Sequence, residues 1–174
     1  MKTIGLFYAM NAAKTSHIAE KIREDLGGVK VIEVVLIEKA WQNDFQAYDN
    51  MIVGASTWFD GELPTYWDEL VPELESLDLK GKKVAIFGLG DQKNYPDNFV
   101  DGMGILADAF QKAGAELVGF TLTDGYTFNQ SRAVRGEKFC GLVIDQENQA
   151  QLTSKRIADW CKLIKEDFTS NKKE

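Results

Sequence analysis

The chain has 174 residues, 44% of them apolar, which suits one ordinary domain with a packed core. Its 27 acidic residues outnumber 20 Lys and Arg, so the net charge is −7 and no basic stripe is present to bind nucleic acid. No apolar run approaches the roughly 20 residues of a membrane span, and the first residues lack the apolar segment of a signal peptide, so we expect a cytoplasmic protein with no membrane partner.

Six apolar runs predict strands, and several are continuous rather than alternating, as buried parallel strands require. In chain order they are Thr3–Tyr8, Lys30–Val35, Met51–Ala55, Val84–Gly88, Leu117–Leu122 and Gly141–Ile144. Between them, apolar side chains at helical spacing predict helices that include Ile18–Leu26, Trp67–Leu74, Phe99–Phe110 and Ile157–Phe168. Gly27 and Gly114 stand where glycines commonly end helices. We expect one domain over residues 1–168 and a polar tail over residues 169–174.

The alternation of strands and helices predicts a parallel sheet that is covered by helices on both faces. In such sheets, ligands bind beyond the carboxyl ends of the strands. Three predicted loops lie at that edge, at residues 9–15, 57–63 and 89–98.

Two of these loops carry an aromatic residue in an unusual place. Trp58 follows a buried strand almost directly, where it is poorly placed to join the core, and Tyr95 lies in the next loop at the same edge. Gly88 and Gly90 allow the backbone of that loop to approach a ligand closely. Two aromatic side chains at one sheet edge suggest a clamp for a flat ring system.

The motifs around these aromatics resemble those of the flavodoxin family. The chain reads Ser-Thr-Trp-x-x-Gly-Glu at residues 56–62 and Gly-x-Gly-Asp-Gln-x-x-Tyr-x-Asp-Asn at residues 88–98. The stretch from Thr123 to Leu142 resembles the insertion that splits the fifth strand in long-chain members of the family. The resemblance implies a flavodoxin-like doubly wound, five-stranded parallel sheet in the order 2-1-3-4-5, with helices on both faces.

The resemblance also implies FMN as a non-covalent cofactor. Trp58 and Tyr95 would then stack on opposite faces of the isoalloxazine ring, and backbone groups around Gly90 and Asp91 would bind its pyrimidine edge. A peptide within Phe59–Gly61 would flip to accept the protonated N5 of the one-electron-reduced flavin. The full set of implied FMN contacts is Met10, Asn11, Ala12, Ala13, Lys14, Thr15, Ser56, Thr57, Trp58, Phe59, Asp60, Gly61, Leu89, Gly90, Asp91, Tyr95 and Asn98.

The first loop departs from the family pattern Ser/Thr-x-Thr-Gly-x-Thr, since Met10, Ala12 and Ala13 replace two hydroxyl residues and the glycine. The loop still opens a helix, whose N-terminal N–H groups attract an anion, and Asn11 and Lys14 can add donors. Losing two hydrogen bonds to a charged phosphate costs about 3–6 kcal/mol, or on the order of 10² to 10⁴ in affinity. Ala13 would add a further energetic penalty if its backbone needed a positive φ, which glycine adopts more easily. The sequence therefore predicts weaker FMN binding.

The function that the resemblance implies is that of a low-potential one-electron carrier and not of an enzyme. It would work as a monomer between a flavodoxin or ferredoxin reductase and acceptor enzymes. From residue 60 to 78 there are seven acidic residues and no Lys or Arg, which predicts docking to basic faces of redox partners. These acids are Asp60, Glu62, Asp68, Glu69, Glu73, Glu75 and Asp78.

Other chemistries have less support in the sequence. His17 is the only histidine, no Gly-x-Ser-x-Gly elbow is present, and Lys93 stands where a dinucleotide fingerprint needs its third glycine. Cys140 and Cys161 form no CxxC pattern and are interpreted as free thiols of a reducing compartment. Two alternatives on the same fold stay open. One is an interaction or regulatory protein with weakened or lost FMN binding, and the other is a flavin-dependent NAD(P)H or quinone reductase.

Overall fold

The computed structural model describes residues 3–58 and 60–170. The helices in these ranges are α1 (Ala13–Asp25), α2 (Gln42–Gln46), α3 (Thr65–Glu75), α4 (Asp101–Lys112), α5 (Gln146–Gln149) and α6 (Thr153–Thr169). The strands are β1 (Ile4–Tyr8), β2 (Ile32–Leu36), β3 (Asn50–Ser56), β4 (Lys83–Leu89), β5 (Glu116–Val118), β6 (Thr121–Leu122), β7 (Val134–Arg135), β8 (Lys138–Phe139) and β9 (Gly141–Ile144).

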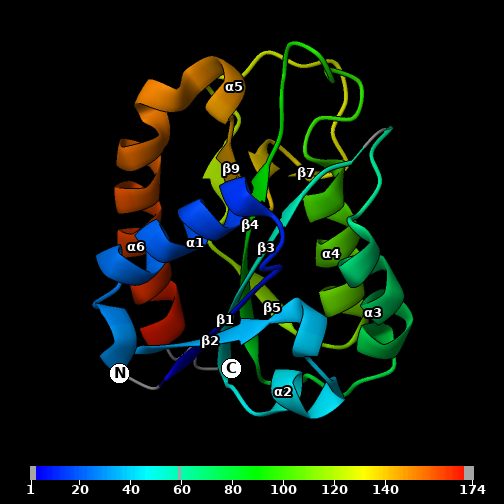
Figure 1. Ribbon diagram of the computed structural model, residues 1–174, viewed down its shortest axis with the longest axis vertical. Helices are drawn as coiled ribbons and strands as arrows, with labels where there is room; N and C mark the ends of the chain where they lie inside the picture. Colours follow the sequence, from blue (N-terminus) through cyan, green and yellow to red (C-terminus); the bar gives the residue numbers. More distant parts are fainter. Residues whose placement is uncertain (1–2, 59, 171–174) are drawn as a thin grey trace.

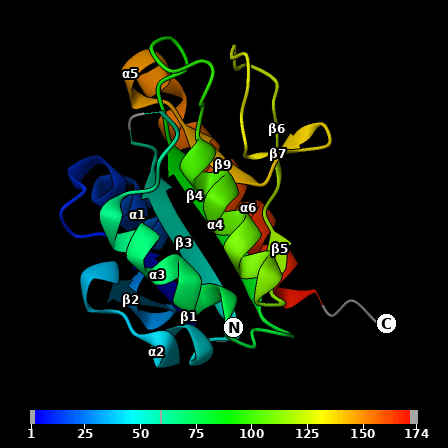
Figure 2. The same ribbon diagram turned by 90° about the vertical axis from the view of Figure 1, so that its right-hand side faces the viewer.

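The molecule has three layers, with the sheet in the middle. Figure 1 shows α1 and α6 side by side on one face of the sheet and α3 and α4 on the other. Figure 2 looks onto the second face, where α3 and α4 lie in front of β3 and β4. No helix in the described ranges is long and apolar enough to cross a membrane.

The sheet is parallel and has the order β2-β1-β3-β4-β5, with β9 also paired to β4. Pairing of β4 is divided between two partners. Its first half, Lys83–Ala85, pairs with β5, and its second half, Ile86–Leu89, pairs with β9. The fifth position of the sheet is therefore filled by two separate segments. This confirms the predicted order 2-1-3-4-5 and the predicted insertion in the fifth strand.

The insertion occupies residues 119–140 and contains a small antiparallel sheet in the order β6-β8-β7. The prediction of one continuous strand over Leu117–Leu122 was wrong, because the chain turns at Gly119, whose φ is 78°. Both backbone groups of Gly119 are held by α6. Its N–H donates to the carboxylate of Asp167 at 2.9 Å, and its carbonyl accepts from the indole N–H of Trp160 at 2.8 Å. These bonds replace the strand pairing that the apolar sequence suggested.

Each face of the sheet has its own apolar core. On the α3 and α4 face, the rings of Phe7 and Phe45 stack at 4.6 Å between centroids, and Phe45 also contacts Trp67. On the α1 and α6 face the core is mostly aliphatic. Burying one large apolar side chain contributes about 1.5–3 kcal/mol to folding. The two cores, one on each face of the sheet, therefore supply the main stabilisation. The buried side chains on the α1 and α6 face include Ile18, Ile22, Ile157, Trp160 and Ile164.

The predicted helices are present, with differences at the ends. Gly27 and Gly114 follow α1 and α4 with φ of 108° and 94°, as helix-ending glycines do. The third predicted helix included Phe99, but α4 begins at Asp101, because Val100 has a left-handed backbone with φ of 48°. Helices α2 and α5 were not predicted, since each is only about one turn long and shows no periodicity.

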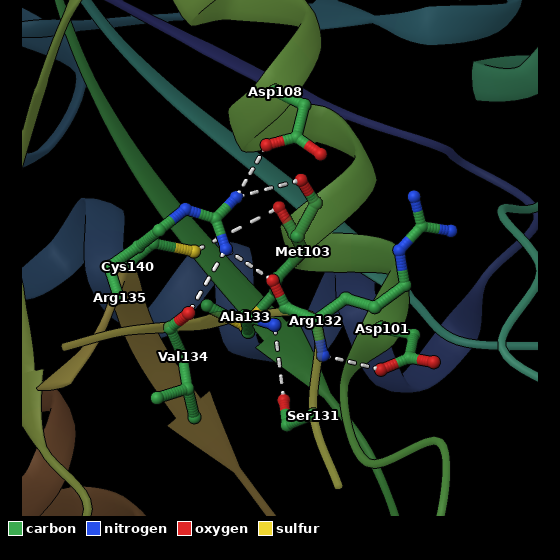
Figure 3. A network of polar contacts seen from close by, with 10 residues as sticks. Asp101, Met103, Asp108, Ser131, Arg132, Ala133, Val134, Arg135 and Cys140 are labelled. Carbon is green, nitrogen blue, oxygen red and sulfur yellow. Dashed lines mark hydrogen bonds and ion pairs between the residues drawn. The ribbon is translucent and has the colours of Figure 1, made fainter. Parts of the chain in front are cut away.

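The insertion is attached to α4 by its arginines (Figure 3). The guanidinium of Arg135 pairs with Asp108 at 2.6 Å and donates to the carbonyl of Gly104 at 3.3 Å and to that of Arg132. The backbone N–H of Arg132 donates to the Asp101 carboxylate at 2.7 Å. The insertion and the start of α4 therefore behave as one packed unit.

We predict that Gly104→Ala destabilises the protein although alanine favours helices. In an exposed helix the change would gain about 1 kcal/mol. Here the new Cβ would lie 2.2 Å from the backbone carbonyl oxygen of Arg132, and such overpacking costs about 1–3 kcal/mol. Urea unfolding should show a net loss of stability. The control Gln111→Ala, on the exposed side of the same helix, should change stability by less than about 0.5 kcal/mol. A stabilised Gly104→Ala variant would contradict the packing described.

Candidate functional site

Three loops follow β1, β3 and β4 at the carboxyl edge of the sheet. We call residues 9–15 the first loop, residues 57–63 the second loop and residues 89–98 the third loop. Because the three strands are parallel neighbours, their ends lie at one edge, at the α5 end of the molecule in Figure 2. This is the edge where doubly wound sheets bind ligands.

The second loop is a tight hairpin that fixes the backbone of Trp58. The N–H of Trp58 donates to the carbonyl of Glu62 at 2.8 Å, and the reverse bond measures 2.7 Å. Just before it, the Thr57 hydroxyl accepts the Gly102 N–H at 3.0 Å, which ties the loop to α4. Phe59, a predicted contact residue, lies outside the described residues. The geometry leaves the Trp58 side chain 39% exposed on a fixed backbone.

The second and third loops contact each other directly. The side-chain amide of Asn98 donates to the carbonyl of Asp60 at 3.0 Å. Gly61 has a φ of 95°, and a Cβ there would lie 2.6 Å from a carboxylate oxygen of Asp101. A larger residue than glycine would therefore push the second loop away from the start of α4 and from Asn98, whose side-chain nitrogen would lie 3.2 Å from that Cβ. The contact brings together three of the predicted site residues, Asp60, Gly61 and Asn98.

Asp91 organises the third loop. Its carboxylate accepts from the backbone N–H groups of Lys93 and Asn94 at 3.1 and 3.0 Å, and from the side-chain amides of Asn94 and Asn148 at 2.7 and 2.8 Å. Partial burial raises the pKa of Asp91, but these hydrogen bonds outweigh that effect and hold the pKa below its usual value. The side chain is therefore ionised at neutral pH. The Asp91 carbonyl accepts the Tyr95 N–H at 2.9 Å, so the same turn positions the tyrosine.

The backbone around Gly90 packs closely against the residues just before α4. A Cβ on Gly90 would lie 2.8 Å from Val100, the residue with the left-handed backbone. The N–H of Gly90 donates to the carbonyl of Ile144 at 3.1 Å. That N–H, which the sequence analysis placed among the groups for a flavin ring, is therefore used within the protein.

Helix α5 connects the third loop to the rest of the edge. The carboxylate of Asp145 is fully buried and accepts from the backbone and side-chain N–H groups of Gln92 at 3.1 and 2.7 Å. It also accepts the backbone N–H of Asn148 at 3.0 Å, which caps α5. The other end of the Gln92 amide accepts the Thr127 N–H at 2.8 Å, so the insertion joins the same network.

The first loop contacts several elements at once. The Asn11 backbone N–H donates to the Glu38 carboxylate at 3.1 Å, and its side-chain amide donates to the Tyr66 hydroxyl at 3.0 Å. Lys14 forms an ion pair with Glu147 of α5. Helix α1 begins at Ala13 without a side-chain cap, and Ala13 does not have the positive φ that the sequence analysis considered. The replacement of glycine at this position therefore causes no such strain.

The structure places the three predicted loops at one edge of the sheet, and residues that the sequence did not point to support them. The two aromatic side chains, Trp58 and Tyr95, are both exposed, with Tyr95 at 51%, whereas the hydroxyl residue of the first loop, Thr15, is buried in the first turn of α1. Sequence reasoning missed the supporting residues, which are Glu38, Tyr66, Gln92, Asp145 and Asn148. Two of them had a usable signal, Asp145 as an acid placed directly after a buried strand and Gln92 as a fixed position of the motif at residues 88–98.

These features define a class. The protein is a doubly wound α/β protein with a ligand cradle at the carboxyl edge of its sheet, and no cluster of His, Cys, Asp and Glu within residues 3–58 and 60–170 could hold a metal ion. The family model for flavodoxin matches residues 6–160, and the chain belongs to the flavodoxin family.

Individual relatives are similar over nearly the whole chain. The flavodoxin of Synechococcus elongatus is 44% identical over 168 residues, which is 97% of this chain and 99% of that protein. The flavodoxin of Klebsiella pneumoniae is 42% identical, covering 95% and 98% of the two chains. Among solved structures, Fusobacterium nucleatum flavodoxin bound to flavin mononucleotide has a TM-score of 0.90 at 35% identity and covers 97% of this chain and 100% of that one.

We predict that Asp145→Ala loosens the third loop and destabilises the protein by about 2–4 kcal/mol, because it leaves buried donors of Gln92 and Asn148 without an acceptor. The measurement is urea unfolding of the flavin-free protein. Asp159→Asn, which alters an exposed pair with Lys155 on α6, is the matched control and should cost less than about 1 kcal/mol. A loss for Asp145→Ala no larger than that of the control would contradict the role assigned to this network.

Proposed function

We propose that this chain is an FMN-dependent, low-potential one-electron carrier. The observation that carries the proposal is the pair of exposed aromatic residues, Trp58 and Tyr95, on two loops that are joined at the carboxyl edge of the sheet. Membership of the flavodoxin family supports it, as does the similarity to the FMN-bound Fusobacterium flavodoxin. We propose that the three loops supply the FMN contacts that the resemblance implies.

The second and third loops suit a flat, partly polar ring. Trp58 and Tyr95 offer aromatic faces that would lose contact with water when a ring covers them, a gain of about 1–3 kcal/mol for each stacked face by analogy with stacked bases. The backbone at Trp58 is fixed without a ligand by its hydrogen bonds to Glu62, and the backbone at Tyr95 is fixed by the turn that Asp91 closes. The site therefore needs little ordering on binding.

The first loop has the kind of hydrogen-bond donors that an anion needs. Its backbone N–H at Asn11 already holds a carboxylate oxygen, that of Glu38, at the start of α1. The positive end of a helix and free backbone donors are the features that bind phosphate groups. We propose that the flavin phosphate binds here, with fewer hydroxyl donors than the family pattern provides.

The residues of the chain would tune the cofactor in two ways. When bound, FMN supplies the redox chemistry, taking up and releasing electrons one at a time. The ionised Asp91, held by its loop, disfavours further negative charge nearby and would lower the reduction potential. The apolar faces of Trp58 and Tyr95 act in the same direction by excluding water.

We predict that flavin-free protein binds FMN with one-to-one quenching of flavin fluorescence and that the bound flavin is reduced in two resolved one-electron steps. Trp58→Ala or Tyr95→Ala should weaken binding by about 10- to 100-fold through loss of stacking. Trp41→Ala is the control, because this exposed tryptophan lies in a surface hollow with Glu73 near the end of α3 and should leave binding unchanged.

The FMN titration, together with an assay of NAD(P)H oxidation, separates the alternatives. Absence of FMN binding at micromolar concentrations would favour an interaction protein that has lost its flavin, an alternative supported by the altered first loop. Oxidation of NAD(P)H without a separate reductase would favour an enzyme. Either result contradicts the carrier proposed here.

We further propose that basic redox partners, a reductase and acceptor enzymes, dock at the acidic segment 60–78. Six of its seven acids are exposed, and it begins in the second loop, next to Trp58. The seventh, Glu75, pairs with Lys112 at 2.8 Å. A negative surface beside the redox centre would steer a basic partner into a productive orientation. We also propose that the protein acts as a monomer in the cytoplasm, with residues 1–168 as its FMN-binding domain.

We predict that electron transfer from a basic reductase slows steeply between about 50 and 500 mM salt, since the charges are screened. Replacing Glu62 and Asp68 together by Gln and Asn should lower the rate at low salt by about 3- to 10-fold. The matched control, Asp159→Asn with Glu166→Gln on α6, removes the same charge from another face and should have little effect. Equal slowing by both double variants would show that only net charge matters.

A further inference from the structure

Glu38 occupies an unexpected position at the first loop. It follows β2 in a short turn, Ile37–Lys39, and its Oε1 accepts the backbone N–H of Asn11 at 3.1 Å. The other carboxylate oxygen is buried and accepts no hydrogen bond from the described part of the chain. A negatively charged group thus lies against the backbone donors that precede α1.

The charge on Glu38 is maintained by these donors. Burial raises the pKa of the carboxyl, but backbone N–H groups of Glu38 itself, Met10 and Asn11, together with the charge of Lys39, outweigh it and hold the pKa below its usual value. The side chain is therefore ionised at neutral pH.

The surroundings explain why an acid is stable there. Helix α1 has no side-chain cap at Ala12 and no acidic residue in its first turn, so its N-terminal groups lack a negative partner within the helix. Lys14, the cation of the loop, is directed to Glu147 instead. Glu38, from outside the helix, is the acid whose carboxylate accepts a backbone N–H of the loop.

We propose that the Glu38 carboxylate occupies the backbone donor of the first loop and thereby lowers the affinity of this chain for flavins that carry a phosphate. The inference rests on the proposed function. A phosphate and a carboxylate cannot share the Asn11 donor, and two negative charges within about 4–6 Å repel each other. FMN must therefore displace Glu38, whereas riboflavin, which has no phosphate, need not. Glu38 in this way sets how strongly the site prefers FMN to riboflavin.

The test is a titration of flavin-free wild-type and variant proteins with FMN and, separately, with riboflavin, followed by flavin fluorescence. Glu38→Gln keeps the shape of the side chain and removes its charge. It should bind FMN about 10- to 100-fold more tightly and riboflavin with unchanged affinity. Glu38→Ala, which removes the hydrogen bond as well, should change the two affinities in the same way. Glu24→Gln, an exposed acid near the other end of α1, is the matched control and should leave both unchanged.

A second readout uses inorganic phosphate as the probe. Millimolar phosphate should raise the melting temperature of flavin-free Glu38→Gln by more than it raises that of the wild type or of Glu24→Gln. An equal shift in all three proteins would overturn the inference, because the loop would then accept phosphate regardless of Glu38.

The outcomes separate this inference from the function on which it rests. Unchanged or weaker FMN binding by Glu38→Gln overturns it, since Glu38 would then support the loop rather than compete there, and the electron carrier would stand. Equal tightening of FMN and riboflavin also overturns it, because the effect would not act through the phosphate. If no variant binds FMN, the proposed function fails, and the phosphate readout still decides the role of Glu38.

Discussion

The parallel pairing of β1, β3 and β4 is the constraint on which the rest of the structure depends. Their registers, Ile4↔Asn50 and Asn50↔Lys83 among them, align the carboxyl ends of the strands at one edge. Without it, the three loops would have no common surface. Because both faces of the sheet are covered by helices, the edge is where side chains such as Trp58 and Tyr95 can be exposed without disturbing a core.

Polar groups then fix the loops that the sheet brings together. The buried carboxylate of Asp145 takes up donors from Gln92 and Asn148, and the ionised Asp91 closes the turn before Tyr95. Buried carboxylates are costly unless their hydrogen bonds are made, so this network favours a single loop arrangement. The one-turn helix α5 is central to it, since it contacts the first loop through Glu147 and the third through Asn148. A rigid edge of this kind suits a carrier whose cofactor must keep its surroundings during electron transfer.

Much of the fold could be predicted from the sequence, because continuous apolar runs and helical spacing report burial directly. The pattern failed where polar contacts override it. At Gly119 the bonds to Asp167 and Trp160 interrupt an apolar run, and at Val100 the left-handed backbone delays the start of α4. For the site, the motifs located the two aromatic loops, but no local pattern identified Glu38 or Tyr66. Their roles depend on how the turn after β2 and the start of α3 approach the first loop, which is a tertiary property.

The central claim is that these loops hold FMN between two aromatic side chains with its phosphate at the start of α1. A crystal structure of the protein with FMN tests this most directly. The account predicts the isoalloxazine ring between the Trp58 indole and the Tyr95 phenol, with the phosphate on the backbone of residues 10–15 and the Glu38 carboxylate moved away from Asn11. A flavin bound elsewhere, or one that touches neither aromatic ring, would contradict it.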